Sequence, residues 1–591
     1  MAPAKRFAWL EPAFFALLCA PAAYYWTTVR PAAQAQLASA ALFAALAFAS
    51  TYYLIPALGP RFLARNLKGK DMGRRGTPEE HVEMCVPARP TPGAQARPTA
   101  RPQPPPPSHP TPPHPPCPSP SGVGLVCAVV FLICVTLSQW RHELQLSDSA
   151  KWWLDLHQSK TVRASAPPQP CPCPCALSTP PQPPFPPLTP PLPRLAPRQV
   201  VFYHSALLSI CFMTLLGFAD DVLDLPWRYK FILPVFASLP LLATYNGGTD
   251  IVLPSLVGQL RGAAPGGGAP PAPTALGALV QSLSLLELKA AEGGAVLVEM
   301  GMWYYVYMGC LGVFATNAIN IHAGINGLEA GQAVVIAIAV LTTNLMEIAS
   351  DGKEPHQGAH LFSALLGLPF LAVTLAVLAH NVFPARAFVG DTFCYFAGMT
   401  LAVQGIHGHF AKTLLIFFAP QAFNFFYSLP QIAKVYPCPR HRLPHFNAAT
   451  GLLEPSRFEV PAGKASGGGG GSGSSSSSSI SSRGSSSSML AGAPASIKSR
   501  RRSVSSSAAA GAGLPAAEAG APRMMDNFTL INLVLRLLGP MHERTTTNVL
   551  LVLQAAACLA GLALRVWHSN SVCTGEQGRA WSVFSTYGGC S

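Results

Sequence analysis

Long apolar runs, each close to the length of a membrane-spanning helix, recur along the chain. A helix needs about 20 mostly apolar residues to cross a bilayer, and it satisfies its own backbone polar groups there. Charged residues make up 11% of the 591 residues, which is less than half of the roughly 25% found in soluble domains. The sequence therefore predicts an all-α, polytopic membrane protein.

Ten runs are predicted to span the bilayer, and the nature of an eleventh is open. The ten are Ala35–Leu58, Gly122–Gln139, Val201–Phe218, Tyr229–Tyr245, Gly301–Thr316, Gly331–Leu345, Leu361–His380, Phe393–Gly408, Lys412–Leu429 and Asn548–Val566. The run Phe7–Val29 is either one more span or a signal sequence, because it begins with basic residues but contains Glu11 and two prolines.

Positive charge sets the predicted orientation. The 40 Lys and Arg outnumber the 26 Asp and Glu, and a basic cluster from Arg61 to Arg75 follows the first strong span. Basic loops stay in the cytoplasm, so polar segments an even number of spans further on are expected at the same face. That face collects Asp220, Asp221, Asn320, Asp391 and the run Arg440-His441-Arg442, which predicts a cytosolic-face active site. Nucleic acid is not an expected partner, because no basic patch is interleaved with aromatic residues.

Four tracts rich in Pro, Gly, Ser or Ala cannot bury enough apolar surface to fold, and we predict that they are disordered insertions. They are Ala88–Pro120, Ser165–Pro197, Arg261–Thr274 and Gly463–Ala521. The predicted organisation is an N-terminal segment (1–34), a first span and loop (35–87), a Pro-rich insertion (88–120), a second span and luminal loop (121–164), a second Pro-rich insertion (165–199), a catalytic membrane core (200–460), a Gly/Ser/Ala tract (461–521), a last cytosolic segment and final span (522–567) and an atypical tail (568–591).

Two adjacent acids at the end of one predicted span are the first candidates for chemistry. Asp220 and Asp221 close an apolar run, and carboxylates next to lipid are costly enough to indicate a function. The plain alternative is a span that ends in water. Lys230 follows shortly afterwards and is a compact charge that suits phosphate, or else a basic anchor at the membrane surface.

Amide side chains and a further acid occur near other span ends. Asn317, Asn320 and Asn326 interrupt an apolar stretch, where amide oxygens can complete a Mg²⁺ shell or can form a hydrogen-bonded turn. Asp391 follows Gly390 at the mouth of a span, either as a ligand or as a helix N-cap.

A basic segment between prolines supplies the last candidates. Arg440, His441 and Arg442 suit the oxygens of a phosphate, or alternatively an anionic lipid surface. Gathered at one face, the acids, amides and cations predict a Mg²⁺-dependent diphosphate site at a bilayer surface.

These stretches resemble the eukaryotic members of the polyprenyl-phosphate N-acetylhexosamine-1-phosphate transferase superfamily, of the glycosyltransferase family 4 type. The most specific motifs are GLEAGQ, FVGDTFCYFAGM and PCPRHRLP, within Leu215–Leu242, Tyr304–Gln332, Phe388–Gly408, His409–Gln431 and Pro437–Leu453. The resemblance implies an enzyme that transfers GlcNAc-1-phosphate from UDP-GlcNAc to dolichyl phosphate, the first step of lipid-linked oligosaccharide synthesis. It also implies a ten-helix protein of the endoplasmic reticulum membrane with a cytosolic active site, and a homodimer is an open expectation.

The resemblance further implies a role for each matching residue. The catalytic set would be Asp220, Asp221 and Lys230. The dolichyl phosphate set would be Lys230, Asn317 and Asn320, and the Mg²⁺ ligands would be Asn320 and Asp391. The UDP-GlcNAc set would be Lys70, Asp71, Met72, Asn326, Arg440, His441 and Arg442.

The first cytosolic loop departs from the family pattern. The family has a Pro-Glu-Ser-x-Gly segment there, with its Glu at the sugar-nucleotide site, whereas here Ala88 and the Pro-rich tract follow Pro87. Our hypothesis is that both Pro-rich tracts are retained intron sequence or an error in the gene model. Two other interpretations of the chain are open: a relative that uses another polyprenyl phosphate or UDP-sugar, and a transporter or non-catalytic paralogue.

Overall fold

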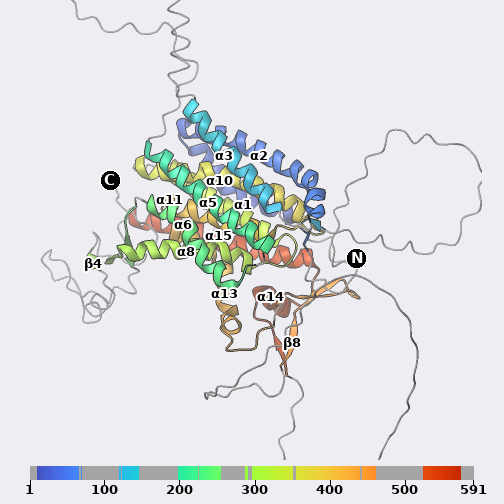
Figure 1. Cartoon of the computed structure of the whole chain (residues 1–591). Coiled ribbons are helices and arrows are strands. Elements are labelled where there is room, and N and C mark those ends of the chain that lie inside the picture. Colours follow the sequence, from blue (N-terminus) through green and yellow to red (C-terminus); the bar gives the residue numbers. More distant parts are fainter. Residues whose placement is uncertain are drawn as a thin grey trace, which may run out of the picture. The chain divides into compact units, whose positions relative to one another are not determined.

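The protein is mostly helical in a computed structural model that describes residues 10–65, 68–69, 119–120, 123–144, 197–223, 225–245, 247–253, 287–290, 296–350, 354–439, 442–460 and 523–573 (Figure 1). The helices are α1 (Leu10–Thr28), α2 (Pro31–Ala64), α3 (Val123–Leu144), α5 (Pro197–Leu223), α6 (Trp227–Ala243), α8 (Met302–Ile321), α9 (Leu328–Ala349), α10 (Glu354–Asn381), α11 (Gly390–His407), α12 (Ala411–Phe417), α13 (Ala419–Ile432), α14 (Leu530–Leu538) and α15 (Glu543–Cys573). Most of both Pro-rich tracts, the Gly/Ser/Ala tract and the end of the tail lie outside the described residues.

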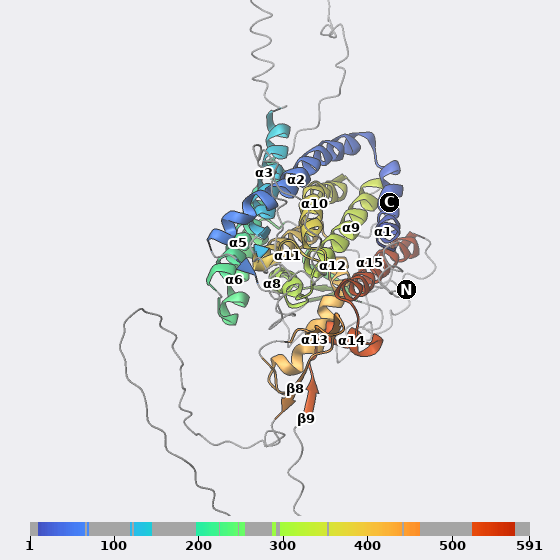
Figure 2. The ribbon, with the colours of Figure 1, turned by 90° about the vertical axis from the view of Figure 1, so that its right-hand side faces the viewer.

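Helix α11 lies at the centre of the helical bundle. It contacts α3, α5, α8, α9, α10 and α12, and Figure 2 shows it surrounded by other helices. Every residue from Thr392 to His407 is buried. Because its neighbours cover all of its sides, α11 can carry polar groups such as Thr400 and Gln404 that would be costly against lipid.

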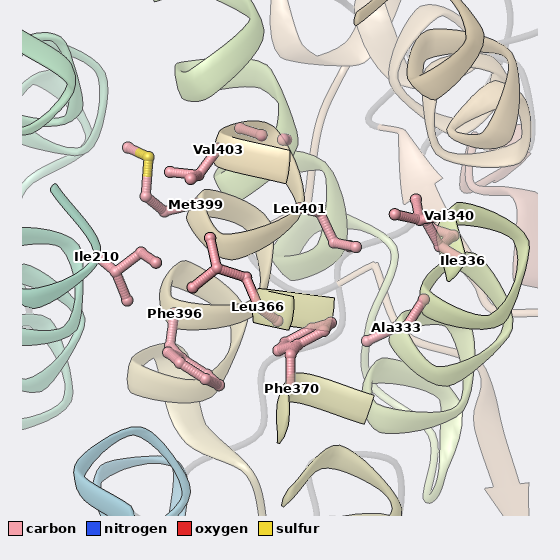
Figure 3. Close-up of a cluster of buried hydrophobic side chains, with 14 of the residues drawn as sticks. Ile210, Ala333, Ile336, Val340, Leu366, Phe370, Phe396, Met399, Leu401 and Val403 are labelled. Atoms are coloured by element: carbon pink, nitrogen blue, oxygen red, sulfur yellow. The ribbon is translucent and has the colours of Figure 1, made fainter. Parts of the chain in front are cut away.

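The core is a set of large apolar side chains that interlock between α5, α9, α10 and α11 (Figure 3). Phe396 of α11 packs with Phe370 of α10 at 5.7 Å between ring centroids. Ile336 of α9 and Ile210 of α5 belong to the same buried cluster. Between helices in a bilayer, close packing of such side chains takes the place of the hydrophobic effect, so this cluster holds α11 in position and with it the polar residues of its first turn.

Five helices of the described part are long and apolar enough to cross a membrane. They are Pro31–Ala64, Val200–Leu223, Leu328–Ala349, Gln357–Asn381 and Glu543–Val566, and a shorter apolar helix is Val123–Gln139. The prediction of a mostly helical membrane protein is therefore confirmed at this coarser level. The other expected spans fall in helices that are either shorter or less apolar than these five.

One expected span, Lys412–Leu429, is divided in the structure. Helix α12 ends before Phe418 and α13 begins after it, with Pro420 in the first turn of α13. Proline has no backbone N–H and clashes inside a helix, but it is well tolerated in a first turn. Most of the run Phe7–Val29, for which the sequence allows either a span or a signal sequence, forms α1. This helix contacts α9 and is not among the candidate spans.

Short antiparallel strands lie in the connections between helices. The pairs are β1 (Lys68–Gly69) with β2 (Ser119–Pro120), β6 (His445–Asn447) with β7 (Leu452–Glu454), and β8 (Arg457–Val460) with β9 (Arg523–Asp526). A three-stranded sheet has the order β3 (Asp250–Leu253), β5 (Val296–Glu299), β4 (Glu287–Ala290). The strands β8 and β9 belong to a separate compact unit, residues 457–526.

Candidate functional site

Three helix ends bring a lysine and two acids together. Lys230, in the first turn of α6, has its Nζ 2.7 Å from Oδ2 of Asp220 in the last turn of α5. The same Nζ lies 3.3 Å from Oδ2 of Asp391 in the first turn of α11. Residues 161 positions apart thus meet because α5, α6 and α11 are held by the core described above.

The two acids around Lys230 differ in their surroundings. The Asp220 side chain is 1% exposed, and it accepts hydrogen bonds from the Leu225 N–H (3.0 Å) and the Tyr395 hydroxyl (3.3 Å). The Asp391 side chain is 29% exposed. Asp220 is therefore a fixed counter-ion that holds Lys230, whereas the Asp391 carboxylate is accessible to a ligand.

Asp221 points in another direction and caps α11. Its Oδ1 accepts the Asp391 N–H at 2.7 Å, and its Oδ2 accepts the Thr392 N–H at 3.0 Å together with the Thr392 hydroxyl. A helix N-terminus leaves such N–H groups without partners, and a carboxylate there is stabilised by the helix dipole. Gly390 has φ of 71°, and a Cβ built on it would lie 2.7 Å from Oδ2 of Asp221, so glycine permits this approach. Val389 occupies the N-cap position of α11 and makes no side-chain capping hydrogen bond, so the carboxylate that caps this helix is that of Asp221 on α5.

Helix α8 adds amides beside the lysine. The Asn317 Nδ2 donates to the Lys230 carbonyl at 3.3 Å and to the Val313 carbonyl at 2.9 Å. Asn320 is about one helical turn further on and is half-buried. The structure therefore places the amide-bearing end of α8 next to the start of α6.

The segment around Asn326 forms hydrogen bonds with α15, the last helix. The Asn326 N–H donates to Oε1 of Glu543 at 2.8 Å, and the Thr547 hydroxyl donates to the Asn326 carbonyl at 3.0 Å. The Gly327 N–H donates to Oδ1 of Asn381 at 3.1 Å. Sequence reasoning missed Glu543 and Asn381 as site-supporting residues. The sequence feature that could have identified them is that both are polar residues at the end of an otherwise apolar run.

The basic segment is only partly described. Asn532 of α14 donates from Nδ2 to the Arg442 carbonyl at 2.8 Å, and the Arg442 side chain is half-buried. Among the contacts of the described residues, none joins Arg442 directly to the acids around Lys230. The remaining predicted nucleotide residues, namely Lys70, Asp71, Met72, Arg440 and His441, lie outside the described residues.

The donor set fits a hard divalent cation. In the described part of the chain, no three His, Cys, Asp or Glu side chains form a complete metal site. Mg²⁺ does not require one, because it commonly keeps several waters and binds one or two carboxylates plus substrate phosphates. Two carboxylates, those of Asp220 and Asp391, face one ammonium group here, so this cluster has an excess of negative charge. The accessible Asp391 carboxylate and the Asn320 amide oxygen are the residues that would hold such an ion.

Fold and site together define a multi-pass membrane protein with a charged, hydrogen-bonded site at the ends of its helices. Residues 203–409, which include all three acids, match glycosyl transferase family 4. The chain is 37% identical over 366 residues, which are 61% of this chain and 69% of the relative, to the UDP-N-acetylglucosamine–dolichyl-phosphate N-acetylglucosaminephosphotransferase of Schizosaccharomyces pombe. The chain therefore belongs to glycosyl transferase family 4, in the branch of these eukaryotic phosphotransferases.

Two further relatives carry the same name. The chain is 45% identical to the protein of Dictyostelium discoideum over 267 residues, which are 43% of this chain and 59% of the relative. It is 45% identical to the protein of Saccharomyces cerevisiae over 258 residues, which are 43% of this chain and 50% of the relative. The matching part thus spans between half and about three fifths of the length of these two relatives.

Proposed function

We propose that the chain transfers GlcNAc-1-phosphate from UDP-GlcNAc to dolichyl phosphate, giving GlcNAc-diphosphodolichol and UMP. This reaction is the first step of lipid-linked oligosaccharide synthesis for protein N-glycosylation. The names of its relatives support the proposal. The structural observation that carries it is the Lys230 ammonium, held between the buried Asp220 and the accessible Asp391 at the ends of three helices.

The proposed step is an in-line displacement at phosphorus. An oxygen of dolichyl phosphate forms a bond to the β-phosphorus of UDP-GlcNAc, and the bond from that phosphorus to the bridging oxygen breaks, so that UMP leaves with the electron pair. The lipid phosphate is already anionic, and the obstacle is its repulsion by the diphosphate. Lys230 lowers this repulsion by binding the lipid phosphate.

Each remaining residue has a role in binding or orientation. Mg²⁺, when bound by Asp391 and Asn320, supplies charge neutralisation for the diphosphate. Asn317 fixes the backbone of Lys230, and Asp221 fixes the first turn of α11 that carries Asp391. Asn326 and Arg442 would contact the nucleotide and the sugar, together with Lys70, Asp71, Met72, Arg440 and His441.

The cellular placement is a proposal of the same kind. The chain would cross the endoplasmic reticulum membrane ten times, with this site facing the cytosol, and it would assemble as a homodimer. The basic cluster after the first strong span supports the orientation, because such loops stay cytoplasmic. An epitope tag after Ser591 and protease protection in sealed microsomes would test the side on which the chain ends.

An assay of the purified full chain with labelled UDP-GlcNAc and dolichyl phosphate tests the reaction. We expect a lipid-linked product and stoichiometric UMP, both abolished by EDTA and restored by Mg²⁺. Asp391→Asn is expected to lower turnover at least about 100-fold, because it removes a charge that faces the ligand. The matched control is Asp526→Asn, whose side chain is 24% exposed and paired with Arg457 in the separate strand pair. Product formation that persists in EDTA, or equal losses in both variants, would contradict the proposal.

A further inference from the structure

The C-terminal end of α8, which is predicted to lie at the cytosolic face, is capped by side-chain amides of other helices. The last carbonyls of a helix have no partner within it, and a buried unsatisfied carbonyl is costly. The Gln332 Nε2 donates to the carbonyls of His322 (2.9 Å) and Ile319 (3.3 Å). The Asn424 Nδ2 donates to the Ile321 carbonyl at 3.4 Å. The helix end that carries Asn317 and Asn320 is therefore held from outside.

These capping amides are themselves fixed by a buried network. The Gln421 Nε2 donates to Oε1 of Gln332 and to Oε1 of Gln554, both at 2.6 Å. The Gln554 Nε2 donates to the Phe417 carbonyl at 2.7 Å. The three glutamines are at most 2% exposed. Hydrogen bonds between amides buried this deeply are strong, because the surroundings have a low dielectric constant, and they hold the Gln332 side chain in place.

Helix α13 extends the network toward the segment of Arg442. Gln421, Asn424, Ser428 and Gln431 lie along one buried face of α13. The Asn424 Oδ1 accepts the Leu530 N–H at 2.8 Å, at the first residue of α14. The Ser428 hydroxyl donates to the Phe528 carbonyl at 2.6 Å, just before that helix. One face of α13 thus contacts both the end of α8 and the start of α14.

Helix α14 completes the connection. Asn532, which is fully buried, donates from Nδ2 to the Arg442 carbonyl at 2.8 Å. Its Oδ1 accepts the Ser456 N–H at 2.8 Å, so the side chain is fixed at both ends. An unbroken hydrogen-bonded path therefore leads from the Ile321 carbonyl through Asn424 and α14 to the Arg442 carbonyl.

We propose that Asn424 and Asn532 are positioning residues that hold the Asn320 end of α8 in register with the Arg442 segment. Neither residue touches a reacting atom in this proposal. They set the distance between two parts of the site. The end of α8 with Asn320 would hold the metal ion at the diphosphate, and the Arg442 segment would contact the nucleotide and the sugar. The proposal rests on the proposed function for its kinetic consequences, whereas its structural consequence does not depend on the reaction.

The test compares three leucine variants of the full chain, Asn424→Leu, Asn532→Leu and the control Asn344→Leu. Leucine has a similar volume and removes all side-chain hydrogen bonds. Asn344 is a matched control because it is fully buried and also makes two side-chain hydrogen bonds, to Ser363 Oγ and with His360 Nδ1, both at 2.9 Å. Three quantities are measured: amide hydrogen exchange of residues 319–327 and 442–447, the KM for UDP-GlcNAc, and the Mg²⁺ concentration for half-maximal rate.

Loss of one buried hydrogen bond corresponds to about a tenfold change in an equilibrium. We expect Asn424→Leu to raise exchange in both segments by about this factor, together with the KM and the Mg²⁺ requirement. Asn532→Leu should affect only residues 442–447 and the KM. Asn344→Leu should leave all three quantities within about twofold of the wild type, even where it lowers the Tm.

Two results would overturn the proposal: an Asn424→Leu protein that behaves like Asn344→Leu, or exchange that rises equally in all three variants. If Asn424→Leu does not fold, the smaller Asn424→Ala replaces it. That variant also removes both the donor to Ile321 and the acceptor for Leu530, so exchange must rise in both segments. A wild-type chain without transferase activity would refute the proposed function, while the exchange data would still decide whether the connection exists.

Discussion

Asp220 and Asp221 are adjacent in the chain but contact different parts of the molecule. Asp220 holds Lys230, and Asp221 accepts two backbone N–H groups of α11. Neighbouring residues on a helix point about 100° apart, so the sequence predicts this separation in direction but not the partner of either acid. Lys230 of α6 follows Asp220 closely in the chain. The partners on α11 come much later: Asp391 is 170 positions from Asp221, and Tyr395, which also contacts Asp220, is 175 positions from it.

At this residue scale, Asp221→Asn is expected to lower kcat by about 10- to 100-fold, because charge-assisted hydrogen bonds contribute about 1.5–3 kcal/mol. An asparagine retains one acceptor but cannot accept at both positions, so the first turn of α11 and with it Asp391 would shift. Steady-state kinetics and the Tm are the measurements. Thr392→Val is the companion variant, since it removes the hydroxyl contact and leaves both backbone contacts. Wild-type kcat in Asp221→Asn would refute any catalytic or positioning role for the residue.

Close contact between helices decides the geometry at the scale of secondary-structure elements. Gly398 of α11 lies against the backbone of α8, where a Cβ would come within 2.4 Å of the Thr316 Cα. Only a residue without a side chain fits such a crossing. The two helices that carry Asp391 and Asn320 therefore approach as closely as their backbones allow.

We expect Gly398→Ala to separate α8 from α11 and to lower activity more than about tenfold, with a loss of about 1–3 kcal/mol of stability from overpacking. The matched control is Gly309→Ala on α8, where the nearest atom, in the Leu242 side chain, would lie 3.6 Å away in ordinary contact. Activity and thermal unfolding of the two alanine variants are compared directly. Equal activity in both would show that the α8–α11 distance does not matter for the reaction.

At the scale of the whole molecule, strand pairing brings together the ends of two long segments. Lys68 is paired with Pro120 in β1 and β2, and Val460 is paired with Arg523 in β8 and β9. Both segments can therefore be shortened without separating the strands that flank them. They differ in content, because the first contains Lys70, Asp71 and Met72 and the second contains no predicted site residue.

Replacement of residues 461–522 by Asn-Gly is expected to leave kcat and both KM values within about twofold, since this dipeptide closes a two-residue hairpin. Replacement of residues 70–118 by the same dipeptide removes the predicted nucleotide residues and should raise the KM for UDP-GlcNAc at least about tenfold. Kinetics of the two shortened proteins with each substrate varied in turn give the answer. A loss of activity in the first protein, or none in the second, would contradict the predicted assignment of these segments.

The sequence by itself determined the membrane class, and it predicted that the candidate site residues share one face. Apolar length and loop charge are local properties, and the parity of successive spans then assigns distant polar residues to one face. The tertiary structure decided what each polar group contacts. Asp221 caps a helix through the N–H group of Asp391, 170 positions later, and Asn424 joins segments 103 and 106 residues away. Such hydrogen bonds depend on the packing of several helices at once, and no single stretch of sequence contains both partners.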